Sequence, residues 1–279
     1  AVYYREISDT RNFRGYAYTD FFMNGRPKSS GYMKKFNNKN TINGPVIIYD
    51  FDGKTAEKSS YLSGKKHGKE IKYYRNGAIR SITGYKNGMK HGKEIKYFEN
   101  ETISYEANYK NDLLHGTETF YKFNGDIITK IEYKYNKYDG KYIVYNENFP
   151  ILEITYKKGV KDGSYNEYFE TGMLKESAVY KRGKIENIKK EYYESGTLRS
   201  EINYNDGVVD GLGRYYYEDG KLLAEGLFSN GIRIGSWKTY NENSKISFIE
   251  NYSNNQEDIE RIEYSLNEIL EAKKYFSKG

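Results

Sequence analysis

The chain has 279 residues, of which 30% are charged and only 37% hydrophobic, and its mean hydropathy is −0.93. Because 33 residues are Tyr and 13 are Phe, aliphatic side chains are too few to fill the core of an ordinary globule of this length. No apolar run approaches the roughly 20 residues of a membrane-spanning helix, and an aromatic content of 17% argues against disorder. The absence of Cys excludes disulfides, thiol nucleophiles and Cys-ligated zinc.

Residues 1–43 predict an atypical repeat that caps the first end of a repeat array. The stretch from Phe21 to Gly25 matches a later stretch from Tyr73 to Gly77, but about four extra residues follow it. Residues 1–14 are compatible with either a first strand or a capping segment. Terminal repeats are expected to be atypical because they must close an exposed end.

Residues 44–258 contain nine units with a period of 24 residues. GKEIKYYRNGAIRSITGYKNGMKH, which begins at Gly68, is followed at Gly92 by GKEIKYFENETISYEANYKNDLLH, and the unit from Gly140 is one residue short. Each unit carries a Tyr five residues after its start and a second aromatic residue near its end. The first set is Tyr49, Tyr73, Tyr97, Tyr121, Tyr145, Tyr168, Tyr192, Tyr216 and Tyr240, and it recurs at Tyr264. Tyr is therefore abundant because the repeat is copied.

Each unit predicts a β-hairpin, because two alternating stretches flank an Asn-Gly type of turn and a second Gly-rich turn follows. A two-residue turn would place Ile79 on the opposite face from Tyr73. A three-residue loop that ends in a left-handed Gly places Ile79 directly across from Tyr73, and the apolar pattern favours this bulged form. The same pattern predicts that Ser81, Thr83 and Tyr85 share the face of Tyr73.

Residues 259–279 predict a degenerate capping repeat. Their apolar spacing also suits an amphipathic helix, but Tyr264, Leu270 and Phe276 fall at the repeat positions, which favours the hairpin. The predicted fold class is therefore all-β: an elongated, twisted, single antiparallel sheet of about ten to eleven stacked hairpins.

The repeat signature resembles the MORN repeat family, and specifically its bacterial variant, whose members are often labelled antitoxin-like. The residues that carry the resemblance are the unit-opening Gly, the Tyr, the Asn-Gly turn and the second aromatic residue between Gly44 and Gly235. The resemblance implies stacked hairpins, and it implies roles as scaffolds, as membrane-associated modules or as appendages to enzymes.

Candidate chemical groups recur with the repeat. His67, His91 and His115 each precede a unit-opening Gly; at roughly 10 Å apart they cannot share one metal ion, so we interpret them as turn residues. Carboxylates such as Glu70 and Glu94 are iterated too, whereas catalysis needs one site that differs from its neighbours. No P-loop, G-x-S-x-G or H-E-x-x-H pattern occurs. The sequence predicts no enzyme activity, cofactor or metal site.

A smaller set of aromatic residues has the opposite parity to the repeat Tyr. These candidate partner-binding residues are Tyr74, Phe98, Phe169, Tyr193, Tyr217 and Trp237. One interpretation is that they form hydrophobic cross-strand contacts that stiffen a thin sheet. The alternative is an exposed aromatic track suited to a peptide, a glycan or another protein, with Trp237 as its fluorescent probe.

The net charge of +6 is unevenly distributed. Residues 1–139 carry 25 Lys and Arg against 16 Asp and Glu, a net +9, while residues 140–279 carry 20 against 23, a net −3. The first half could meet an anionic lipid surface, but its charges alternate in sign, which favours a solvated face and gives no reason to expect nucleic-acid binding.

The function predicted from these features is a non-enzymatic scaffold or binding protein with a protein partner, and a glycan is the other ligand class that the aromatic track suits. One alternative is an antitoxin-like inhibitor that acts on a toxin protein in the cytoplasm, and another is a module that binds anionic membrane surfaces. The start at Ala1 without Met and the Asn-, Lys-, Tyr- and Ile-rich composition favour an exported or cell-surface protein of a bacterium.

Overall fold

The computed structural model describes residues 3–9, 15–36, 39–253, 258–265 and 269–277. These residues form 24 β-strands and no helix, and every strand pairing is antiparallel. Within that described part there is accordingly no helix long and apolar enough to cross a membrane. The chain divides into two compact units, Ala1–Tyr138 and Asp139–Gly279. The all-β, antiparallel prediction is confirmed, although 24 strands correspond to more hairpins than the ten to eleven predicted.

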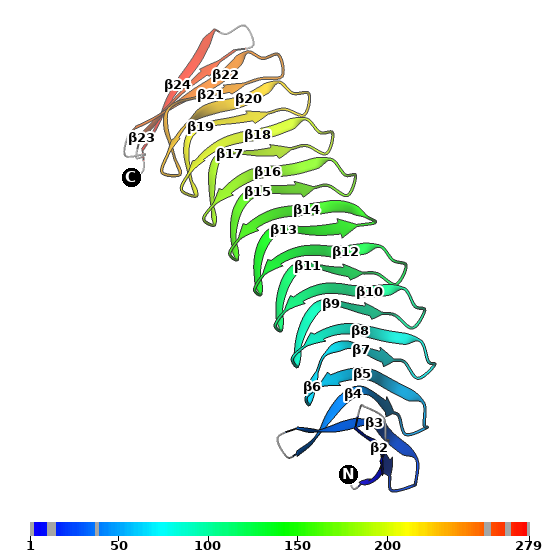
Figure 1. Cartoon of the computed structure of the whole chain (residues 1–279). Helices are drawn as coiled ribbons and strands as arrows, with labels where there is room; N and C mark the ends of the chain where they lie inside the picture. The colour runs from blue at the N-terminus through cyan, green and yellow to red at the C-terminus, as the bar shows by residue number, and fades with distance from the viewer. Residues whose placement is uncertain (1–2, 10–14, 37–38, 254–257, 266–268, 278–279) are drawn as a thin grey trace. The chain divides into compact units, whose positions relative to one another are not determined.

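The first unit contains strands that follow one another in chain order (Figure 1). They are β1 (Tyr3–Asp9), β2 (Tyr16–Phe22), β3 (Pro27–Phe36), β4 (Lys39–Tyr49), β5 (Thr55–Leu62), β6 (Lys65–Lys66), β7 (Gly68–Tyr73), β8 (Ile79–Lys86), β9 (Met89–Tyr97), β10 (Ile103–Lys110), β11 (Leu113–Tyr121) and β12 (Ile127–Lys134). Both β6 and β7 pair with β5, so they are two parts of one interrupted strand.

The second unit continues the same alternation. Its strands are β13 (Lys137–Asn146), β14 (Phe149–Lys157), β15 (Val160–Tyr168), β16 (Leu174–Lys181), β17 (Lys184–Tyr192), β18 (Leu198–Asn205), β19 (Val208–Tyr216), β20 (Leu222–Ser229), β21 (Ile232–Tyr240), β22 (Ile246–Tyr252), β23 (Asp258–Tyr264) and β24 (Leu270–Ser277). The last two form a hairpin, so the described residues of the segment that also suits a helix are extended strands.

The first turn of each repeat is the bulged loop that the apolar pattern predicts. In the unit from Gly68, Tyr73 lies opposite Ile79, and the register shifts between Lys72 and Tyr73. The Gly77 N–H donates to the carbonyl of Tyr74 over 2.9 Å, and Gly77 has φ = 93°. A left-handed conformation costs little for Gly, which explains why the turn ends in this residue.

The prediction for the second strand of the hairpin is wrong. Ser81, Thr83 and Tyr85 lie opposite Lys72, Glu70 and Gly68, so all three share the face of the charged residues and not that of Tyr73. The reason is the bulge itself: an extra residue in one strand reverses the parity of everything beyond it.

The unit from Gly140 is one residue short because its hairpin has a different turn. Glu147 and Asn148 have φ of 49° and 68°, which is the two-residue type I′ geometry, and Asn146 pairs directly with Phe149. The register shift one pair further along, between Val144 and Tyr145, is retained. The unit therefore has one residue fewer in its loop and keeps the bulge in the strand.

Candidate binding face and turn edge

One face of the first unit carries buried carboxylates, and we call it the charged face. Glu70, Glu94 and Glu118 occupy the same repeat position on β7, β9 and β11, and they are only 2%, 5% and 7% exposed. Buried charges are costly unless they are paired, so each of the three needs partners.

Lysine side chains neutralise the first two carboxylates. Glu70 forms ion pairs with Lys66 and with Lys72, the latter at 3.1 Å. Glu94 accepts two hydrogen bonds from the Lys90 ammonium at 2.9 and 3.0 Å, and a third from the Thr83 hydroxyl at 3.3 Å. Lys66 and Lys90 each lie four residues before their Glu, after the turn that precedes it. The repeat thus supplies its own counter-ion.

Tyrosine replaces lysine around Glu118. The Tyr105 hydroxyl donates to Glu118 over 2.8 Å and lies 3.2 Å from the hydroxyl of Tyr109. Burial, reinforced by the hydrogen bond to Glu118, raises the pKa of Tyr105 and of Tyr133 well above the ordinary value. These phenols therefore stay protonated and act as hydrogen-bond donors.

A groove of about 410 Å³ opens on the charged face above β7 to β10. It is lined by Glu70, Lys72, Tyr74, Arg80, Ser81, Thr83, Tyr85, Lys90, Glu94, Lys96, Tyr97 and Ser104. Its volume lies within the range of roughly 300 to 1,000 Å³ that small-molecule sites occupy.

The second turn of each repeat forms the turn edge of the unit. In the first unit these two-residue turns lie at residues 63–64, 87–88, 111–112 and 135–136, and both residues of each have positive φ. Main-chain bonds link successive turns to preceding strands, as in the 2.8 Å bond from the Gly88 N–H to the Lys66 carbonyl. The turns are thereby stacked, two strands or roughly 10 Å apart.

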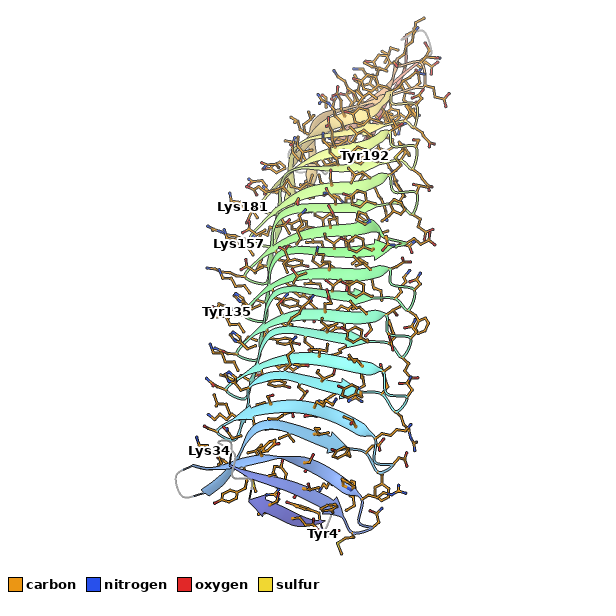
Figure 2. All side chains as sticks on the ribbon, turned by 45° about the vertical axis from the view of Figure 1, so that its right-hand side comes forward. Tyr4, Lys34, Tyr135, Lys157, Lys181 and Tyr192 are labelled. Carbon is orange, nitrogen blue, oxygen red and sulfur yellow. The ribbon has the colours of Figure 1, made fainter. Side chains whose placement is uncertain are left out.

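A cationic and an apolar side chain face each other across three of these turns. The cross-strand pairs are Leu62 with Lys65, Lys86 with Met89, and Lys110 with Leu113, and all six residues are exposed. Tyr135 is exposed on the fourth turn and points outward in Figure 2. In the second unit, Lys157 pairs with Val160, and Figure 2 shows Lys157 and Lys181 pointing away from that unit's sheet.

The structure distributes the six aromatic candidates over two environments. Tyr74, Phe98, Phe169, Tyr193 and Tyr217 each open a hairpin turn and are half-buried. Three of them use their hydroxyls to hold the next hairpin: Tyr74 donates to the carbonyl of Tyr97 over 2.6 Å, and Tyr193 and Tyr217 make the same bond, each over 2.8 Å, to Tyr216 and Tyr240. These contacts fit the interpretation as cross-strand packing, and partner binding stays a prediction.

Trp237 does not lie on an exposed track, which corrects the expectation that it probes an outer surface. It is 2% exposed on β21, with its ring centroid 4.9 Å from that of Phe228 and its indole N–H donating to the Leu227 carbonyl over 3.0 Å. Two glycines make room for it: a Cβ on Gly226 would lie 2.2 Å from the indole, and one on Gly213 would lie 2.7 Å from the Phe228 ring.

The three histidines lie beside the turns but are not turn residues, because none has positive φ. Side chains at their repeat position reach the next turn instead. Asn43 accepts from the Ser63 N–H over 3.1 Å, Glu186 accepts from the Asp206 N–H over 3.1 Å, and His91 lies 3.3 Å from the Asn111 side chain. The Nδ1 atoms of His67 and His115 are buried without a hydrogen-bond partner among the described residues, so only some side chains at this position bond to a turn. Among the described residues no group of three or more His, Asp or Glu side chains could hold a metal ion.

Among the described residues, every carboxyl group with a shifted pKa has that pKa lowered, which favours the charged form. A hydrogen bond from Lys175 lowers the pKa of Glu167, and bonds from Lys189 and Ser200 lower that of Glu191 despite its burial. General acid catalysis at neutral pH needs the opposite shift.

Sequence reasoning missed the groove. Lys72 and Lys96 stand one residue before the repeat Tyr, where the second unit has Glu167 and Glu191, and this departure from the repeat is the signal that was available. Ser81 and Arg80 carried no signal, because the bulge decides which face their side chains occupy.

Comparison with known proteins identifies the repeat. The family model described as MORN repeat variant matches seven segments of 22 residues, together more than half of the chain. The segments are residues 66–87, 90–111, 114–135, 161–182, 185–206, 209–230 and 233–254. The short unit from Gly140 lies in the gap between the third and fourth segments. No curated protein matches the chain.

Solved structures give only distant similarities. A chain of the Tc holotoxin pore of Photorhabdus luminescens is 11% identical with a TM-score of 0.20; the match covers 89% of this chain and 14% of that one, so this chain spans about one seventh of its length. A porin-like protein from Bacteroides uniformis is 8% identical with a TM-score of 0.20, over 98% of this chain and 96% of that one. Neither score is high enough to support a shared fold.

Proposed function

Because the chain belongs to the MORN repeat variant family, we propose that it is a non-enzymatic binding module that serves as a scaffold for a protein partner. The observation that carries this proposal is the turn edge of the first unit, where exposed pairs such as Lys86 with Met89 and Lys110 with Leu113 recur at the repeat spacing. Exposed apolar groups in a regular row indicate an interface, and the cations beside them favour an acidic partner surface.

The turn edge predicts a specific loss of binding. We expect the variant with Lys86→Gln, Met89→Ser, Lys110→Gln and Leu113→Ser to recover its partner from a source-cell extract at least about tenfold less well than the parent chain. The changes lie on exposed side chains, so the melting temperature should stay within a few degrees of that of the parent. The matched control is Val208→Ser with Ile232→Ser, which removes exposed apolar groups from the turns of the second unit. Equal recovery by all three proteins would remove the turn edge from the proposal.

The same edge supports a second candidate, an anionic membrane surface, because adjacent cations and aliphatic groups suit a lipid headgroup layer. Sedimentation with phosphatidylserine-rich vesicles at about 50 mM and about 500 mM salt separates the two candidates. Binding at low salt that the edge variant loses would favour the membrane, and no sedimentation at low salt would exclude it. The antitoxin-like role gains no support from the family match, which identifies a repeat and not an activity.

A further inference from the structure

The groove on the charged face is distinct from the turn edge and carries a surplus of positive charge. Its two carboxylates, Glu70 and Glu94, are already neutralised by Lys66, Lys72 and Lys90. Arg80 and Lys96 have no carboxylate partner among the described residues. The Lys96 ammonium is placed by the Tyr105 ring, whose centroid lies 4.4 Å away. An anionic group that enters the groove would therefore meet two uncompensated cations.

The groove floor offers an unused hydrogen-bonding group. Ser81 is 9% exposed, and its hydroxyl makes no hydrogen bond to any described residue. The hydroxyl is therefore free to bond a polar group that enters the groove. The hydroxyls of Ser104 and Tyr85 line the same groove and are likewise not bonded within the described part of the chain.

The lining also defines the chemical class of the ligand. No aliphatic side chain lines the groove, and its aromatic side chains on the charged face are Tyr74 and Tyr85. Aromatic rings beside hydroxyls and cations suit a ligand with many hydroxyl groups, apolar C–H faces and a negative charge. A peptide segment would instead be expected to find an apolar pocket for an anchor side chain.

We propose that this groove binds an anionic saccharide, with its acidic group between Arg80 and Lys96 and a hydroxyl bonded to Ser81. The positive charge is not repeated along the chain. The residue before the repeat Tyr is Lys72 or Lys96 in the first unit but Glu167 or Glu191 at two positions of the second unit. The saccharide site is separate from the turn edge, so either proposal can fail without the other.

The test uses calorimetric titration of the full chain with trigalacturonic acid, with neutral maltotriose and with hexaglutamate. We expect the acidic trisaccharide to bind and maltotriose to bind at least about tenfold more weakly. The double variant Arg80→Gln with Lys96→Gln should lose about tenfold or more in affinity, and Ser81→Ala should lose a few-fold. Arg199→Gln, at the repeat position of Arg80 but in the second unit, is the matched control and should bind like the parent.

Melting temperatures establish that each variant is folded. If the double variant is unfolded, the affinity of Ser81→Ala for trigalacturonic acid tests the proposal instead. The proposal is overturned if trigalacturonic acid does not bind, if maltotriose binds equally well, or if folded groove variants keep the parental affinity. Binding of hexaglutamate without the trisaccharide would also overturn it, and would identify the groove as a site for acidic peptides.

Discussion

Trp237→Ala is expected to lower the free energy of unfolding of the second unit by about 3 to 5 kcal/mol, the cost of removing a large buried aromatic side chain. The indole is 2% exposed, packs against Phe228 and Tyr215, and lies under the Arg233 guanidinium at 4.3 Å. Its loss leaves a cavity over Gly226 and removes the hydrogen bond from the indole N–H to the Leu227 carbonyl. Urea unfolding followed by circular dichroism measures the change.

The glycine beneath the indole gives an independent check of the same packing. Gly226→Ala should displace the ring, because the added Cβ would lie 2.2 Å from it, and Trp fluorescence should shift to longer wavelength as water reaches the indole. Phe149→Ala, a change of an exposed aromatic side chain in the same unit, is the control and should cost well under about 1 kcal/mol. A Trp237→Ala protein as stable as this control would show that the cluster does not hold the second unit together.

The environment of Trp237 shows where sequence reasoning stops. Its position on the strand and its parity follow from the repeat, and both were predicted. Its burial depends on Gly213 and Gly226, which lie on β19 and β20 and replace larger residues found at those positions in other units. A glycine in a strand signals a close approach, but only the pairing of the strands shows which ring approaches it.

The bulge was predictable and its consequence was missed. The Asn-Gly turn and the apolar residues Tyr73 and Ile79 were enough to select a three-residue loop. The strand after the bulge was then assigned by continuing the alternation from Tyr73, although an inserted residue reverses it. Alternation without the reversal puts Thr83 and Ser81 on the face opposite Glu70, so the sequence does not predict the groove that these three residues line. The exposed pairs of the turn edge depend on the type of the second turn. Lys86 pairs directly with Met89 because the two residues between them form a two-residue turn with positive φ, and the sequence indicates only that this turn is rich in Gly.

The charged face predicts a second large effect. Lys90→Met should destabilise the first unit by about 3 kcal/mol at neutral pH, because Glu94 is 5% exposed and would lose the ammonium group that pairs with it at 2.9 Å. Breaking one side of a buried ion pair costs far more than the pair contributes, since the remaining carboxylate is held away from water. Urea unfolding of the full chain, analysed for the transition of the first unit, measures the loss.

Two further variants separate buried charge from lost packing. In Lys90→Met with Glu94→Leu neither charge remains, so most of the stability should return; a double variant as unstable as Lys90→Met would mean that the methylene stem of Lys90 matters and its charge does not. Lys93→Met is the matched control, because the Lys93 side chain is half exposed and its 2.7 Å pair with Glu106 should be worth less than about 1 kcal/mol. If Lys90→Met lowers the free energy of unfolding no more than Lys93→Met does, then water reaches Glu94 in solution and its carboxylate is not buried.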